Sequence, residues 1–330
     1  MMDIPHPRDT CDWIGETAAD AAVLSALERD RMHHAWLLQG PRGVGKATFA
    51  YRAARRLLGA RPAAPLGLLG SDPEDPVSRQ VAARAHPDLL VLQRDLEDGK
   101  ARRNILVGDA RDLPEFFSKS PASAPFRIAI VDAADDLNLN AANALLKILE
   151  EPPSRGVIFL VSHAPGGLLS TIRSRCRRLA IAPTGPEAAR AWLADRAGVG
   201  PAEADSLLAM ARGAPGGAWR LAEAGALEVD AAAARIVSAL PQLEDRDVQS
   251  LADGFRPPLG QVRFRLFFDR LADRIHDRAR DEAAGGRMDR ARAWSAAWTD
   301  TLELARRTEA VNLDRNDVLF TALSRLRAIA

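Results

Sequence analysis

The chain has 330 residues, of which 47% are apolar and 27% are charged, and this composition predicts a globular protein of two or three domains without membrane-spanning segments. Its 45 basic and 44 acidic side chains leave a formal net charge of +1, so DNA binding through a general positive field is not expected. The two cysteines, Cys11 and Cys176, are too few for a disulfide framework or a thiolate zinc site. Because the N-terminal stretch lacks the apolar segment of a signal peptide, we expect a cytoplasmic protein.

The first half of the sequence alternates strand and helix patterns. Short apolar runs typical of buried parallel strands occupy residues 34–40, 88–93, 127–132, 156–162 and 178–183. Residues 46–59 place apolar side chains at helical spacing and end in a glycine, and residues 138–153 run from asparagines suited to capping to a Pro-Pro stop. This alternation predicts an α/β domain with a mostly parallel sheet.

The strand signals disappear after about residue 184. The remaining sequence is rich in Ala, Leu and Arg, with apolar residues three and four apart, and it predicts an all-helical second half. A break near residues 240–248 indicates one further boundary. We therefore expect three domains, at residues 1–183, 184–242 and 243–330. Residues 59–87 begin with many Pro, Gly and Ala residues and predict a loop or an insertion rather than a core element.

The letters GPRGVGKATFA, which begin at Gly40, nearly match a Walker A loop. In that pattern backbone N–H groups cradle phosphates, a lysine reaches the outer phosphates and a Ser or Thr hydroxyl holds the magnesium ion. Gly40, Gly43, Gly45 and Lys46 follow a predicted strand and open a predicted helix, so they are the candidate nucleotide-binding residues. Ala47 occupies the hydroxyl position. The next residue, a threonine, is no substitute because it points about 100° away on a helix.

A second candidate element is the acidic end of the strand RIAIVDAADD. Asp132 would face the metal of a bound nucleotide, and Ala133 stands where many ATPases carry the glutamate that polarises water. A positioned base contributes about 10² to 10⁴ in rate, so its absence argues against efficient turnover. A purely structural interpretation also stands, in which Asp132 ends a strand and Asp135 caps the following helix.

The third element is the arginine-rich stretch TIRSRCRRL at residues 171–179. Such a cluster is compatible with a solvated face or with a patch that contacts phosphates. An arginine given in trans to a neighbour's γ-phosphate is worth about 10³ to 10⁵ in rate, and Arg175 is the candidate for that role.

Taken together, HHAWLLQGPRGVGKATFA, IVDAADD, NAANALLKILEEPP and LLSTIRSRCRRL closely resemble the AAA+ subunits of the bacterial sliding-clamp loader over about residues 30–183. The resemblance implies a RecA-like AAA+ P-loop domain, a small helical lid and a helical collar that oligomerises. It also implies partners: the gamma/tau and delta subunits of the loader, with the sliding clamp and primed DNA reached through the complex and no membrane.

The resemblance also implies roles for individual residues. Ser174-Arg175-Cys176 matches the motif whose arginine reaches the ATP site of the neighbouring motor subunit. Arg220 matches the lid arginine that senses nucleotide, although a surface pair with Glu223 is an equally good interpretation. The family's zinc module falls at about residues 60–85, where this sequence has no cysteine, so no zinc is expected.

These features favour an accessory subunit, a stator whose degenerate site holds ATP without turnover and which gives Arg175 to a neighbour. The alternative is an active motor ATPase of the gamma/tau type that uses Lys46 and Asp132, and Ala47 and Ala133 argue against it. A small-molecule kinase would need an acceptor-binding insert and a lid with several arginines near the phosphates, whereas the second half is typical of a helical scaffold.

Overall fold

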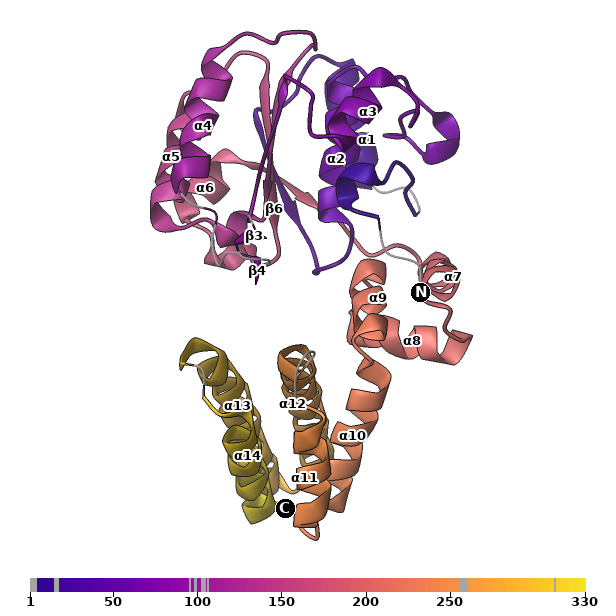
Figure 1. Ribbon diagram of the computed structural model, residues 1–330, viewed down its shortest axis with the longest axis vertical. Helices are drawn as coiled ribbons and strands as arrows, with labels where there is room; N and C mark the ends of the chain where they lie inside the picture. The colour runs from indigo at the N-terminus through magenta and orange to yellow at the C-terminus, as the bar shows by residue number, and fades with distance from the viewer. Residues whose placement is uncertain are drawn as a thin grey trace. The chain divides into compact units, whose positions relative to one another are not determined.

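The computed structural model describes residues 5–14, 18–94, 96–97, 100–101, 105, 107–255, 260–311 and 313–330. The chain forms two compact units, Met1–Trp219 and Arg220–Ala330 (Figure 1). No helix in the described part of the chain is long and apolar enough to cross a membrane. The three predicted domains, with boundaries at residues 183 and 242, are finer than this division and stay predictions.

A five-stranded parallel sheet organises the first unit. Its strands are β1 (Ala35–Gln39), β2 (Leu89–Gln93), β5 (Arg127–Asp132), β6 (Gly156–Ser162) and β7 (Arg177–Ala180). They are arranged in the order β2-β5-β6-β1-β7, and every neighbouring pair is parallel. The predicted α/β class is therefore confirmed, and each strand overlaps one of the apolar runs. Strand β7 begins one residue before the run predicted at residues 178–183 and ends three residues before its end.

Helices cover both faces of this sheet (Figure 1). One face carries α1 (Ala18–Glu28), α2 (Lys46–Leu57) and α3 (Pro76–Ala82), and the other carries α4 (Val107–Ser118), α5 (Leu139–Glu150) and α6 (Ser170–Arg175). Successive strand residues point to opposite faces, so Leu38 joins the core with Phe49 of α2, while Leu37 joins the core with Ile172 of α6. Helices α2 and α6 thus lie on opposite sides of the sheet.

The insertion predicted at residues 59–87 contributes more to the core than expected. Leu69 and Val81, both fully buried, pack into the same core as α2. An antiparallel bridge joins Pro62 to Ser71, and the 3-10 helix η2 (Ala64–Leu66) lies within the loop that it closes. The segment is a packed loop followed by α3, because its few apolar side chains have a place on the α2 face. Short elements elsewhere are the strand pair β3 (Leu96–Glu97) and β4 (Lys100–Ala101) and the 3-10 helices η1 (Pro7–Asp9), η3 (Ala134–Asp136) and η4 (Pro165–Gly167).

Helices follow one another after β7, as predicted. Three of them, α7 (Pro186–Ala197), α8 (Pro201–Met210) and α9 (Pro215–Glu223), begin with proline, whose missing N–H is unneeded in a first turn. The first unit ends within α9, at Trp219. Among the described residues beyond Ala180 no strand occurs, so the all-helical second half is confirmed.

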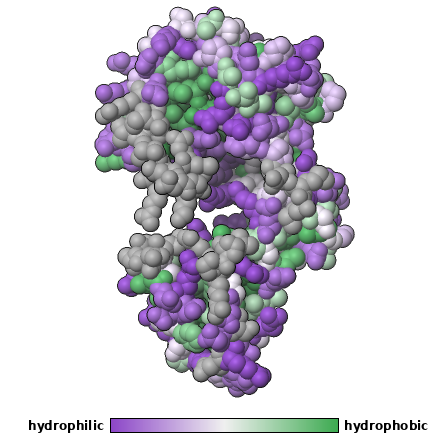
Figure 2. Space-filling model, viewed as in Figure 1, coloured by the Kyte–Doolittle hydropathy of each residue, from purple (hydrophilic) through white to green (hydrophobic). Residues whose placement is uncertain are grey.

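The second unit is a helical bundle made of α10 (Ala226–Ala239), α11 (Asp245–Asp253), α12 (Gly260–Ala284), α13 (Met288–Val311) and α14 (Arg315–Ile329). Helix α12 packs against α10 and α13, and α14 packs against α11 and α13. Four phenylalanines with neighbouring ring centroids 4.6 to 5.9 Å apart form an aromatic cluster: Phe255, Phe264, Phe267 and Phe268. The visible surface of this bundle is largely hydrophilic (Figure 2).

Candidate functional site

The Walker-like loop lies between β1 and α2, and α2 begins at Lys46 as predicted. Gly40, Gly43 and Gly45 have φ values of 153°, 84° and 100°, a region that side chains rarely adopt. A Cβ on Gly40 would stand 2.4 Å from the carbonyl oxygen of Ile181, so glycine is required there by contact as well as by conformation. The loop therefore has the backbone shape that holds an anion against the first turn of a helix.

Lys46 lies folded back over this loop. Its Nζ donates hydrogen bonds to the carbonyl oxygens of Gly40 at 2.6 Å and Pro41 at 2.8 Å, and the residue is 2% exposed. A lysine at this position suits phosphate as a point charge. Ala47, the next residue of α2, offers no oxygen to a metal ion. The loop thus offers a positive charge to an anion but no hydroxyl to a metal ion.

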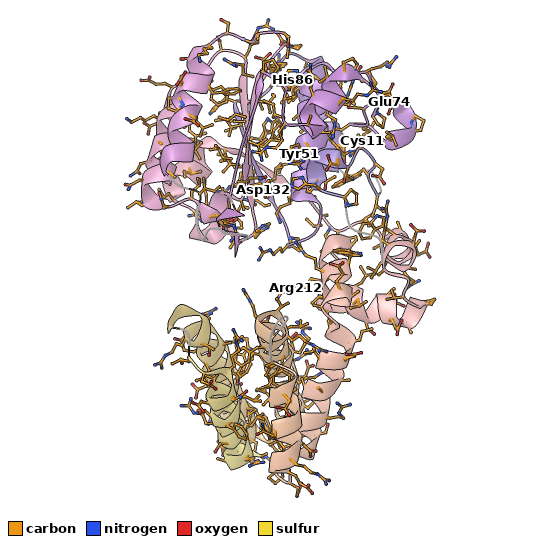
Figure 3. All side chains as sticks on the ribbon, viewed as in Figure 1. Cys11, Tyr51, Glu74, His86, Asp132 and Arg212 are labelled. Atoms are coloured by element: carbon orange, nitrogen blue, oxygen red, sulfur yellow. The ribbon has the colours of Figure 1, made fainter. Side chains whose placement is uncertain are left out.

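Asp132 ends β5 at the same edge of the sheet (Figure 3). Burial, followed by the neighbouring charge of Asp136, raises the pKa of Asp132 above its ordinary value, while Lys46 and Arg42 oppose that rise. The positive charge of Lys46 thus acts on the carboxyl of Asp132. Ala133 is 3% exposed and carries no group that could activate water.

Asp135 has a structural role that differs from the predicted helix cap. Its carboxylate accepts hydrogen bonds from Ser162 Oγ at 2.9 Å, His163 N at 2.7 Å and Ala164 N at 2.9 Å, all just beyond or at the end of β6. Burial alone raises the pKa of this carboxyl, but these donors outweigh it and hold the pKa below its usual value. The cap of α5 is Asn138, whose side chain accepts from the backbone N–H of Ala141 at 2.9 Å.

Arg175 ends α6, on the sheet face opposite α2. Its Nη1 donates to the carbonyl oxygen of Thr171 at 3.0 Å, and its Nη2 lies 2.9 Å from Glu150 Oε1 at the end of α5. The side chains of Arg175 and Glu150 are 35% and 51% exposed, so both charges face solvent. Ser174 Oγ donates to Thr171 O, and burial raises the pKa of the Cys176 thiol to about 12. Cys176 is therefore a packing residue rather than a reactive thiol.

Arg220 lies in α9, and the residues before it touch the Walker-like loop. The backbone N–H of Gly216 donates to Gly43 O at 3.0 Å, and a Cβ on Gly216 would stand 2.9 Å from that oxygen. The first turn of α9 thus packs directly on the loop through a glycine. A nucleotide contact by Arg220 and its pairing with Glu223 both remain predictions.

A family model described as "DNA polymerase III, delta subunit" matches residues 16–185, more than half of the chain. The DNA polymerase III subunit delta' of Pseudomonas aeruginosa is 40% identical over 209 residues, which cover 63% of this chain and 61% of that protein. The chain belongs to the DNA polymerase III delta-prime family. The predicted resemblance to the subunits of the bacterial clamp loader is confirmed.

Further relatives of this delta-prime family member are also polymerase III subunits. Subunit delta' of Bacillus subtilis is 32% identical over 50% of this chain and 47% of its own length. A gamma/tau subunit of Mycobacterium tuberculosis is 33% identical over 57% of this chain and 31% of its own length. The chain thus spans less than two thirds of the length of the curated relatives it matches. A gamma subunit-related structure from Thermotoga maritima aligns at 19% identity over 92% of this chain and 98% of its own, with a TM-score of 0.49.

In this delta-prime family member, the region expected to match a zinc module is closed by polar contacts. Arg61 pairs with Asp72 at 2.7 Å, and its backbone N–H donates to Asp75. No cluster of three or more His, Cys, Asp or Glu side chains that could hold a metal ion occurs in the described part of the chain. Packing of Leu69 and these hydrogen bonds hold the loop.

The contacts of two residues beside the site are not identifiable from the sequence alone. Glu150 lies inside the quoted motif NAANALLKILEEPP, but its pairing with Arg175 depends on the packing of α5 against α6. Trp13 lies against the Walker-like loop, 32 positions away from Gly45 in the sequence, and no local pattern reveals that contact.

Proposed function

We propose that this chain is the delta-prime subunit of a cytoplasmic clamp loader and works as its stator, giving Arg175 to the nucleotide of a neighbouring motor subunit. The observation that carries the proposal is the place of Arg175. It ends α6, which packs on the sheet face opposite α2, and its guanidinium is partly exposed. Such an arginine is available to a partner rather than to the chain's own Walker-like loop.

The contacts of Arg175 suit that role. The exposed pair with Glu150 contributes only about 0.2–1 kcal/mol, so a phosphate with a higher charge can replace the carboxylate at small cost. The bond from Nη1 to Thr171 O fixes part of the side chain against α6 and leaves the other nitrogen of the fork to recognise an anion. An arginine that stabilises a neighbour's transferring phosphoryl group is worth about 10³ to 10⁵ in rate.

The chain's own site keeps residues that would hold phosphates but lacks the groups that turnover needs. Gly40, Gly43, Gly45 and Lys46 would hold the phosphates of ATP, and Asp132 would face the accompanying metal ion. A bound ATP would supply the phosphoryl group for transfer. Ala47 and Ala133 provide neither the metal-binding hydroxyl nor the base that such a transfer needs.

A motor ATPase of the gamma/tau type is the competing function. The effect of the Lys46 charge on Asp132 and the identity to gamma/tau subunits favour it. It would have to work without the hydroxyl at Ala47, and Asp135, the second acid of the motif, is engaged by three donors at the end of β6. We expect the isolated chain to show negligible ATP hydrolysis.

The proposal is tested in a loader reconstituted from this chain with the gamma/tau and delta subunits of the same organism. Co-purification and the mass of the complex establish the partners. ATP hydrolysis stimulated by the sliding clamp and primed DNA is then measured with Arg175→Ala and with Arg178→Ala, a neighbouring exposed arginine on β7, as the matched control. We expect a sharp loss only in Arg175→Ala, and equal activity of the two variants would contradict the proposed function.

A further inference from the structure

The N-terminal segment, residues 5–14, is fastened to α2 by buried arginines. Arg52 donates from Nε to Cys11 O at 3.3 Å, and Arg55 donates to Thr10 O at 3.3 Å and to Arg8 O. Arg52 and Arg55 are each 1% exposed, and Arg52 also pairs with the buried Asp20 at 3.2 Å. Because buried guanidinium groups need their hydrogen-bond partners, these contacts fix the path of the segment along α2.

This path brings the ring of Trp13 against Gly45. An ideal Cβ built on Gly45 would lie 2.9 Å from both Cη2 and Cζ3 of Trp13, the far edge of the indole. The ring also meets Phe49 edge to face at a centroid distance of 6.2 Å, and the Arg52 guanidinium lies 5.3 Å from its centroid. Trp13 is therefore held by α2 at the very start of that helix.

The space beside Gly45 has a defined use in a phosphate-binding loop. Gly45 is the N-cap of α2, with φ 100°, and the free N–H groups of the first helical turn point outward from it. Phosphates rest on these amides, and a glycine at the N-cap lets a ligand approach the backbone where a Cβ would otherwise stand. In this structure the edge of an indole occupies that position.

We infer that Trp13 is an intramolecular plug of the nucleotide site: its ring occupies the space that the phosphates of a nucleoside di- or triphosphate need beside Gly45. A nucleotide binds only when Trp13 swings away, so its apparent affinity is reduced by the fraction of molecules in which the site is open. The plug adds to the losses at Ala47 and Ala133, because those losses oppose turnover whereas the plug opposes binding. In this respect the inference rests on the proposed function and deepens it.

The plug is built to be displaceable. Trp13 is only partly buried, yet its Nε1 is shielded from solvent and has no hydrogen-bond partner in the described structure. A buried donor without a partner is unfavourable, so the indole gains a hydrogen bond to water when it leaves. The contacts with Phe49 and Arg52 hold the ring in place, while this N–H favours its release.

The experiment is isothermal calorimetry with ADP and magnesium on the full chain, comparing the wild type with Trp13→Phe and Trp13→Ala. Trp13→Phe keeps an aromatic ring near Phe49 and Arg52 but loses the far edge that meets Gly45, so it tests the plug without emptying the site. We expect at least tenfold tighter ADP binding in both variants. The matched control is Trp298→Ala, a partly buried tryptophan of the second unit, which should bind ADP as the wild type does.

Two controls test whether the gained ADP binding occurs at the Walker-like loop of a folded protein. Adding Lys46→Ala to Trp13→Ala should abolish the gained binding, and thermal unfolding of each variant establishes that it is folded. Wild type and Trp13 variants that bind ADP equally, or that all fail to bind it, would overturn the plug, as would binding that persists without Lys46. These measurements use the isolated chain, whereas the Arg175 test uses the assembled loader, so either idea can fail without the other.

Discussion

Asp132 and Asp135 stand three residues apart but should respond in opposite ways to the same change, Asp→Asn. The three donors to Asp135 stabilise its carboxylate, and hydrogen bonds to charged groups contribute about 1.5–3 kcal/mol each when buried. Because Asp135 is exposed, hydrogen bonds from water offset part of this stabilisation. We therefore expect Asp135→Asn to lower the free energy of unfolding by about 1–2 kcal/mol. For a unit of this size the melting temperature should fall by about 2–8 °C.

For Asp132 the expected change in the free energy of unfolding has the opposite sign. Burial and Asp136 raise its folded pKa, so its charged form is disfavoured in the folded state, and Asp132→Asn should leave stability unchanged or increase it at pH 7. The pH dependence follows from the same signs. The folded pKa of Asp135 is lowered, so its stabilisation is complete above the unfolded value of about 3.9 and is lost as the pH falls through the folded pKa.

The assay is calorimetric unfolding of the two variants and the wild type at pH 7 and near pH 3.5. At pH 7 we expect the order of stability to be Asp132→Asn equal to or above wild type, with Asp135→Asn below both. The gap between wild type and Asp135→Asn should narrow at the lower pH. An Asp135→Asn protein as stable as the wild type at pH 7 would refute the structural role of Asp135 at the end of β6.

Three more predictions concern the Arg175–Glu150 pair, the buried carboxylate of Asp88 and the insertion at residues 59–87. Glu150→Ala should change the free energy of unfolding by less than about 1 kcal/mol. It should strengthen binding to a motor subunit by at most about fivefold, with Glu151→Ala as the control variant. A tenfold loss of that affinity would contradict the weak pairing of Glu150 with Arg175. Asp88 is 0% exposed, accepts three backbone N–H bonds and pairs with the buried Arg127 at 3.4 Å. Because Asp88→Asn removes one charge of this buried pair, it should lower the free energy of unfolding by about 3–5 kcal/mol in a denaturant titration, and a change below about 1 kcal/mol would contradict the role of the pair. Leu69→Ala should lower the free energy of unfolding by about 2–5 kcal/mol. A chelator should leave the melting temperature of the wild type unchanged, and a lower melting temperature with the chelator would indicate a bound metal ion.

Much of the fold follows from the order of residues along the chain. Continuous apolar runs mark strands that are buried on both faces, and β5 and β6 match the predicted residues because both are central in the sheet. The position of the P-loop is also predictable from the sequence, because its strand, glycines, lysine and helix follow one another directly along the chain. The edge strand β7 was placed less well, because it is exposed on most of its length and so carries a weaker apolar signal.

The site was less predictable because its contacts join distant segments. The donors to Asp135 come from the end of β6, 27 to 29 positions away, and only the pairing of β5 with β6 brings them together. The core role of Leu69 was hidden in a stretch rich in Pro and Gly, whose composition indicates turns but says nothing of one leucine that finds the α2 face. The contact of Trp13 depends on the buried arginines of α2, which no hydrophobic pattern reveals.

We propose that this chain serves a neighbour's nucleotide through Arg175 and not its own through Lys46. The most direct test measures clamp- and DNA-stimulated ATP hydrolysis by the reconstituted loader with Lys46→Ala and, separately, with Arg175→Ala in this chain alone. We predict that Lys46→Ala retains the wild-type rate, while Arg175→Ala removes the hydrolysis at the adjacent motor site, for which a trans arginine is worth about 10³ to 10⁵ in rate. A loader slowed by Lys46→Ala as much as by Arg175→Ala, or more, would contradict the account and favour a motor function.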